Sequence, residues 1–170
     1  MSTASQNPAD GPVVELHDLV YAWPKQQPVI DIPELVIARG ERVFLAGPSG
    51  SGKSTLLGLI GGVLAPASGD IAVMGQSLAA LSVAKRDRYR ADYVGFVFQL
   101  FNLLPYLSVI ENVTLACRFS ERRRDRVLQK STNLEAEAER LLSQLDVSAE
   151  LLTRKVTELS IGQQQRVAVA

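Results

Sequence analysis

A glycine-rich stretch at residues 47–55 has the residue types and spacing that bind a polyphosphate. It matches the pattern G-x-x-x-x-G-K-[ST] at every fixed position. Its glycines let backbone amides turn inward around an anion, and a following helix adds positive potential. We expect Lys53 to bridge the β- and γ-phosphates and the Ser54 hydroxyl to bind Mg²⁺. The predicted phosphate-binding residues are Gly47, Pro48, Ser49, Gly50, Ser51, Gly52, Lys53, Ser54 and Thr55.

A second phosphate-facing feature lies near the other end of the sequence. Residues 159–166 contain Ser160 and Gln163 at the spacing of a capping box, so a helix is predicted to start at Ser160. A helix N-terminus with a serine hydroxyl and the small Gly162 beside it is a good surface for a phosphate. Taken alone, the segment also fits an ordinary capped helix.

Together these motifs resemble the ATP-binding-cassette (ABC) family of transporter ATPases. Residues 159–163 resemble its Leu-Ser-Gly-Gly-Gln signature, about 110 residues after the phosphate loop (the family's Walker A), and residues 97–99 resemble its Q-loop. Residues 101–105 and 109–113 are similar to the macrolide-export and lipoprotein-release branch. The resemblance covers residues 13–170. It implies an α/β, P-loop NTPase fold of the ABC type, with a strand-rich core layer and a helical subdomain.

The resemblance also implies roles around ATP and Mg²⁺. Gln99 would reach the Mg²⁺ and its water and sense the membrane partner. This makes Lys53 and Gln99 the catalytic residues within the chain, and Ser54 and Gln99 the metal-binding ones. The family stacks adenine on an aromatic residue after the first strand, a position held here by Trp23. Tyr21 is the alternative, and a tryptophan that only covers the sheet edge is the other interpretation.

In the same family the signature closes the phosphate site of a second domain. By this resemblance Ser160, Gly162 and Gln163 would act in trans within a head-to-tail dimer, most simply a homodimer. Ile161 stands where the family commonly has its first glycine. Because the contacts to the γ-phosphate come from Ser160 and Gly162, we expect Ile161 to be tolerated.

Other residues of the family's catalytic machinery are not in the 170-residue sequence. The family needs a strand ending in Asp-Glu after the signature, and then a switch histidine. The only histidine, His17, lies near the N-terminus. We therefore interpret the sequence as C-terminally truncated, and we do not expect residues 1–170 alone to hydrolyse ATP.

The predicted function is that of the ATP-binding, energy-coupling subunit of an ABC transporter, an ATPase when complete. Its partners would be a second ABC domain and a membrane permease, which would hold it at the cytoplasmic face of the inner or plasma membrane. The alternative is a nucleotide-binding module that does not hydrolyse ATP. Chromosome-maintenance ATPases share the signature, but the region between the two motifs is too short for their long coiled coils.

Composition supports a protein that binds no nucleic acid. Lysine plus arginine equals aspartate plus glutamate at 18 each, which lacks the basic excess typical of nucleic-acid binders. The longest apolar candidate for a membrane span, residues 56–65, is about half of the ~20 residues that a span needs. The single cysteine, Cys117, can form no disulfide within the chain.

The elements that must position these residues follow from local patterns. Residues 1–12 are predicted to be a loose tail, residues 13–98 a strand-rich core, and residues 99–170 a helical subdomain that begins with the Q-loop. Strands are predicted at residues 13–22, 34–38, 42–46, 71–74 and 94–98. A helix is expected from Lys53 to about residues 61–62, and capping boxes at residues 108–111 and 132–135 predict two more helix starts.

Overall fold

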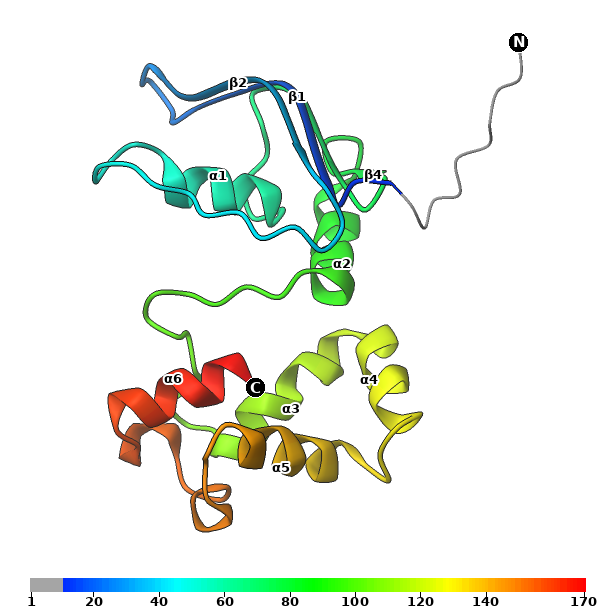
Figure 1. Cartoon of the computed structure of the whole chain (residues 1–170), viewed down its shortest axis with the longest axis vertical. Coiled ribbons are helices and arrows are strands. Elements are labelled where there is room, and N and C mark those ends of the chain that lie inside the picture. The colour runs from blue at the N-terminus through cyan, green and yellow to red at the C-terminus, as the bar shows by residue number, and fades with distance from the viewer. Residues whose placement is uncertain (1–10) are drawn as a thin grey trace. The chain divides into compact units, whose positions relative to one another are not determined.

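The computed structural model describes residues 11–170, which form two compact units that divide between Asp87 and Arg88. Apart from its last two residues, the predicted tail at 1–12 lies outside the described residues. Within residues 11–170, no helix combines the length and the apolar character that a membrane crossing requires. The first unit holds the sheet and the second holds most of the helices (Figure 1).

The first unit contains four strands and one complete helix. They are β1 (Val14–Ala22), β2 (Pro28–Ile37), α1 (Lys53–Ile60), β3 (Ser68–Val73) and β4 (Gln76–Ser77). Helix α2 (Val83–Tyr93) contains the boundary between the units. The second unit continues with α3 (Val109–Phe119), α4 (Glu121–Leu128), α5 (Leu134–Gln144) and α6 (Ile161–Val169), and with two 3-10 turns, η1 (Ala149–Leu151) and η2 (Val156–Glu158).

The sheet is antiparallel and its strands follow the order β2-β1-β3-β4. In the centre, Leu16 of β1 pairs with Leu35 of β2 on one side and with Ile71 of β3 on the other. Leu16 and Ile71 are fully buried, and so is Leu59 of α1. Helix α1 lies beside the sheet (Figure 1). Burial of these apolar side chains is what holds α1, and therefore the loop before it, against the sheet.

Three of the predicted strands overlap β1, β2 and β3. Strand β2 is longer than the predicted strand at residues 34–38, because it starts at Pro28 and continues through Pro33. Proline cannot donate a ladder hydrogen bond, but β2 is an edge strand of this sheet, where a missing donor is tolerated.

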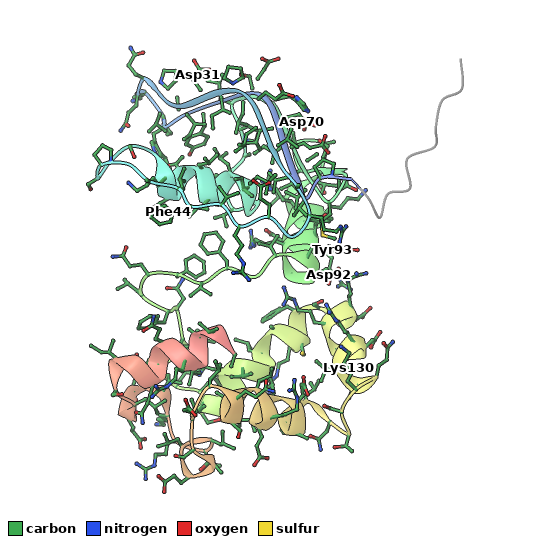
Figure 2. All side chains as sticks on the ribbon, in the orientation of Figure 1. Asp31, Phe44, Asp70, Asp92, Tyr93 and Lys130 are labelled. Carbon is green, nitrogen blue, oxygen red and sulfur yellow. The ribbon has the colours of Figure 1, made fainter. Side chains whose placement is uncertain are left out.

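The strands predicted at residues 42–46 and 94–98 are wrong. Neither run pairs with another strand anywhere in residues 11–170. Phe44, labelled in Figure 2, is 91% exposed, and Phe98 is 39% exposed. An apolar run forms a buried strand only when neighbouring strands bond both of its edges, and the described residues provide no such neighbour.

The second unit has its own apolar core, built mainly from α3, α5, α6 and the two 3-10 turns. Val109, Leu142 and Val167 supply one buried side chain from each of the three helices. Helix α5 turns an apolar stripe to this core: Ala138 and Leu142 are buried, and Leu141 beside them is half-buried. Tertiary burial, more than helix propensity, therefore stabilises this group of short helices.

Local capping sets where these helices begin. At the start of α3, the Ser108 hydroxyl accepts a bond from the Glu111 amide, and the Glu111 carboxylate accepts one from the Ser108 amide, as predicted. The hydrogen bonds from Ser108 hold the pKa of Glu111 below its ordinary value. At α5 the capping residue is Asn133 instead of the predicted Thr132, since the Asn133 side chain accepts a bond from the Ala136 amide at 2.7 Å.

Candidate nucleotide-binding site

The phosphate loop at residues 47–52 leads directly into α1, which begins at Lys53 as predicted. Gly52 precedes the helix in the left-handed conformation, with φ 86°. A side chain there would place its Cβ 2.9 Å from Ile30 Cδ1 and 3.0 Å from the Val29 carbonyl oxygen. Position 52 therefore requires glycine for both its backbone conformation and its close approach to β2.

The N-terminus of α1 has no side-chain cap. Within residues 11–170 no side chain accepts a hydrogen bond from its first amides, and its first turn contains no acidic residue. The first amides of a helix have no partner within the helix, and the helix dipole makes this end positive. The start of α1 is therefore a surface that an anion from outside the chain can satisfy.

Lys53 places a positive charge in the mouth of the loop. Its Nζ donates to the carbonyl oxygens of Gly47 at 2.8 Å and Pro48 at 2.6 Å, and to Ser51 Oγ at 3.3 Å. These contacts hold the ammonium group over the loop. A phosphate that enters the loop would meet a cation that is already in place.

The remaining loop side chains lie on the surface around this cation. Ser49, Ser51 and Ser54 are exposed, and Thr55 is half-buried. A hollow of about 390 Å³ borders the loop between β2 and α1. Its lining includes Lys53, Ser51 and the β2 residue Asp31, which is labelled in Figure 2.

Trp23 directly follows β1 and keeps part of its ring exposed, at 41%. Tyr21, the alternative aromatic residue, is buried and meets the Trp23 ring edge-on, with 5.2 Å between ring centroids. Of the two, only Trp23 has a ring surface that a base could reach. Tyr21 is instead placed to support Trp23 from the side.

The signature segment starts α6 in the second unit. Ser160 Oγ accepts a bond from the Gln163 amide at 3.3 Å, and Gln163 Oε1 accepts one from the Ser160 amide at 2.9 Å, which is the predicted capping box. Ile161 is 76% exposed and supports no core. Gly162 is also exposed, and a Cβ there would meet no atom within 4 Å.

Gln99 also belongs to the second unit, where it lies exposed in a turn. The backbone around it is held locally, because the Phe101 amide donates to the Phe98 carbonyl at 3.0 Å. The structure thus brings the loop residues 47–55 together at α1 and brings Ser160, Gly162 and Gln163 together at α6. It describes Gln99 within the same unit as α6.

Residues 31–170 match the ABC transporter family. The chain belongs to that family. This ABC chain is 40% identical, over 96% of its length, to the lipoprotein-releasing system ATP-binding protein LolD of Anaeromyxobacter dehalogenans. It is 37% identical, over 94% of its length, to the macrolide export ATP-binding/permease protein MacB of Marinobacter nauticus.

A solved ABC structure confirms the predicted α/β fold class. The dimeric post-hydrolysis structure of the ATP-binding cassette MJ0796 bound to ADP and Pi superposes with a TM-score of 0.78 at 33% identity. The match covers 92% of this chain and 67% of that one. The chain also spans 66% of the length of the LolD relative and 24% of the MacB relative.

Sequence reasoning missed one set of functional candidates in this ABC chain, the polar residues that join α2 to α4. There the Ser120 hydroxyl donates to the Asp92 carboxylate, and the Arg123 side chain donates to the Ala91 carbonyl oxygen. Ser120 and Asp92 are 28 residues apart in the sequence, and Arg123 and Ala91 are 32 residues apart. No local spacing rule links residues that far apart. The only sequence signal here is Ser120, three residues before Arg123, because serine commonly caps the N-terminus of a helix.

Proposed function

We propose that this chain is the ATP-binding, energy-coupling part of an ABC transporter and that the complete subunit hydrolyses Mg-ATP. The observation that carries the proposal is the start of α1. There an uncapped helix N-terminus, a glycine loop and a lysine already held in the loop mouth converge on one point. Preorganised donors of this kind bind a phosphate group without rearranging the fold.

Residues of the loop fit Mg²⁺ only in combination with the nucleotide. Mg²⁺ prefers oxygen ligands, keeps several waters, and is commonly held by one or two protein groups plus phosphate oxygens. Within residues 11–170 no group of three His, Cys, Asp or Glu side chains could hold a metal by itself. The exposed Ser54 hydroxyl on the first turn of α1 would supply one oxygen, and Gln99 a second.

The signature at α6 would act on a second copy of the domain. The MJ0796 cassette that this chain resembles is dimeric and has ADP and Pi bound. In a head-to-tail dimer of this chain, Ser160 and Gly162 would meet the γ-phosphate held by the partner's loop. A membrane permease would complete the assembly at the cytoplasmic face, by likeness to the LolD and MacB relatives.

The test is ATP binding by the Lys53→Ala variant. Loss of charge-assisted hydrogen bonds to phosphate costs about 1.5–3 kcal/mol, so binding of Mg-ATP should weaken roughly 10- to 150-fold. The matched control is Lys85→Ala, which removes an exposed lysine from α2. Calorimetric titration should give wild-type affinity for the control. Equal affinities for the wild type and Lys53→Ala would refute the phosphate-loop assignment.

A further inference from the structure

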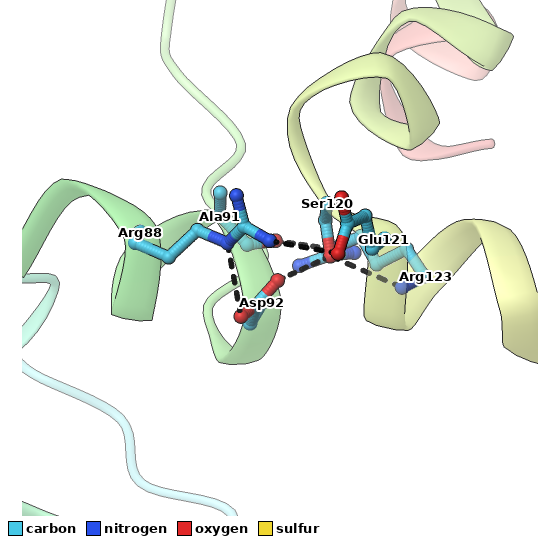
Figure 3. A network of polar contacts seen from close by, with 6 residues as sticks. All are labelled: Arg88, Ala91, Asp92, Ser120, Glu121 and Arg123. Carbon is cyan, nitrogen blue, oxygen red and sulfur yellow. Dashed lines mark hydrogen bonds and ion pairs between the residues drawn. The ribbon is translucent and has the colours of Figure 1, made fainter. Parts of the chain in front are cut away.

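A polar network joins the end of α2 to the start of α4 (Figure 3). Its centre is Ser120, which ends α3, starts α4 and is fully buried. The Ser120 hydroxyl accepts a bond from the Arg123 amide at 3.0 Å and donates one to Asp92 Oδ1 at 2.5 Å. The hydroxyl thus donates one bond and accepts one, and it joins α2 and α4 at one buried point.

Arg123 adds a second connection in the same place. Its Nε donates to the Ala91 carbonyl oxygen at 2.6 Å, and its Nη2 donates to the Val94 carbonyl oxygen at 2.9 Å. The last carbonyl groups of a helix have no partner within the helix, and a cation near this end also interacts favourably with the helix dipole. The planar guanidinium bonds one of these carbonyls, that of Ala91, and the Val94 carbonyl just after the helix at the same time, which an ammonium group cannot do with the same geometry.

The surrounding ion pairs contribute little to this arrangement. Arg88 lies 3.7 Å from Asp92 and 3.3 Å from Glu121. The Arg88 and Glu121 side chains are more than half exposed, so solvent screens their attraction. The part-buried hydrogen bonds of Ser120 and Arg123 are therefore what hold the end of α2 at the start of α4.

The position of Val94 gives the Arg123 contact its significance. Val94 is the first residue after α2, and Gln99 lies five residues later. No strand pairing holds residues 94–98 within the described part of the chain. On the far side of Gln99, the Asn112 side chain of α3 accepts a bond from the Leu104 amide at 2.8 Å and donates one to the Leu104 carbonyl at 3.2 Å.

The segment that carries Gln99 is thus anchored at both ends by side chains of the helical unit. We propose that Arg123 is a positioning residue: by holding the Val94 carbonyl it fixes the start of the segment 95–103 and so the place of Gln99. This inference rests on the proposed role of Gln99 at Mg²⁺ and the attacking water. It assigns Arg123 no contact with the nucleotide.

Arg123 should therefore affect turnover and not nucleotide binding, because the phosphate loop lies in the other unit. The experiment uses the chain at the full length of its relatives and measures kcat and KM for Mg-ATP. Misplacing a reacting group by about 1 Å can cost on the order of 10²-fold, so Arg123→Gln should lower kcat about 10- to 100-fold with KM little changed. Arg124→Gln is the matched control, because Arg124 is exposed on the same helix and forms an ion pair with its neighbour Asp125.

A double variant separates positioning from a merely structural role. If Arg123 acts through Gln99, Arg123→Gln combined with Gln99→Ala should turn over no more slowly than Gln99→Ala alone. Arg123→Lys, which keeps the charge but not the two-pronged geometry, should give an intermediate kcat and remains usable if Arg123→Gln does not fold. Hydrogen exchange of amides 95–102 should rise in both Arg123 variants and stay at the wild-type level in Arg124→Gln.

Three results would overturn the inference. One is a kcat of Arg123→Gln equal to that of Arg124→Gln. Another is a double variant in which Arg123→Gln lowers kcat as much in the Gln99→Ala background as it does in the wild type. The third is an unchanged kcat in Gln99→Ala, which refutes the role of Gln99 itself. This third result leaves the proposed ATPase function standing if Lys53→Ala still abolishes turnover, so the two failures are distinguishable.

Discussion

The two helices that carry the nucleotide motifs begin in different ways. Helix α1 follows Gly52 in a left-handed conformation and has no side-chain cap. Helix α6 follows Ser160 in an extended conformation, and Ser160 and Gln163 cap it reciprocally. Both starts carry a motif that is predicted to bind phosphate, yet only α6 has a first-turn amide bonded by a capping side chain.

From this difference we infer separate roles: α1 binds the phosphate, and α6 acts when two domains close on each other. The first amides of α1 and the Lys53 ammonium group are offered to a ligand, so α1 can bind a phosphate by itself. Helix α6 already binds the Gln163 amide with its own cap, and it offers the Ser160 hydroxyl and the open surface at Gly162. We infer that α1 supplies most of the affinity for ATP, and that α6 adds contacts only when a second domain approaches.

The largest expected effect distinguishes the glycines at the two helix starts. Gly52→Ala forces a side chain into a left-handed position and against Ile30 and the Val29 carbonyl. The conformation and the overpacking together should cost about 2–5 kcal/mol of stability and displace the phosphate loop. Thermal unfolding and ATP titration should both show the loss.

Gly162→Ala is the control for this change. Position 162 is helical and open, so alanine should leave the fold unharmed and can stabilise α6 by up to about 1 kcal/mol. Equal stability losses in Gly52→Ala and Gly162→Ala would contradict the difference between the two helix starts.

The second prediction tests whether α1 and α6 of different copies share one site. In full-length homodimers, Lys53→Ala damages the loop, and Gly162→Asp places a carboxylate where the γ-phosphate should dock. Two unit charges 4 Å apart at an effective dielectric of about 20 repel by ~4 kcal/mol, which opposes closure. The open surroundings of Gly162 accept the aspartate without a clash.

Mixing the two inactive variants should restore part of the ATP-dependent closure. A mixed dimer has one site with both defects and one site with an intact loop and an intact signature. Cross-linking across the interface measures closure, and subunit exchange must be demonstrated in the same sample. Mixtures that close no better than either variant alone would exclude a shared site.

The third prediction asks whether the first unit also binds the base. Trp23→Ala should weaken ATP binding by ~1–3 kcal/mol, on the scale of base–aromatic stacking. The fluorescence of Trp23, the only tryptophan, should change when ATP is added to the wild type. If Trp23→Ala binds ATP normally while Tyr21→Ala does not, the base contact belongs to Tyr21.

The smallest effect concerns the cap of α6. Gln163→Ala removes the bond between Gln163 Oε1 and the Ser160 amide, which should cost about 0.5–1 kcal/mol of stability. ATP affinity of the isolated chain should not change, because α1 does not depend on this cap. A drop in affinity measured on the monomer would show that the two helix starts are coupled within one chain.

The sequence by itself determined the local features whose interactions span only three or four residues. The start of α1 at Lys53 and the capping boxes at Ser108 and Ser160 are confirmed, while phosphate binding by the loop stays a prediction. Each depends on a backbone conformation or a bond between residues i and i+3, so its whole cause lies within one short window. The single miss of this kind, Thr132, lies next to the actual cap Asn133, and both residue types cap helices.

Only the tertiary structure decided which segments pair and which distant side chains meet. Apolar runs at residues 42–46 and 94–98 have strand composition but pair with no strand within residues 11–170, whereas β2 extends past two prolines because β1 pairs with it. Helix α2 is largely charged and buries no residue, so it showed no apolar stripe to predict. Strand pairing and the bonds of Ser120 and Arg123 connect residues far apart in sequence, and their energy depends on where the folded chain places both partners.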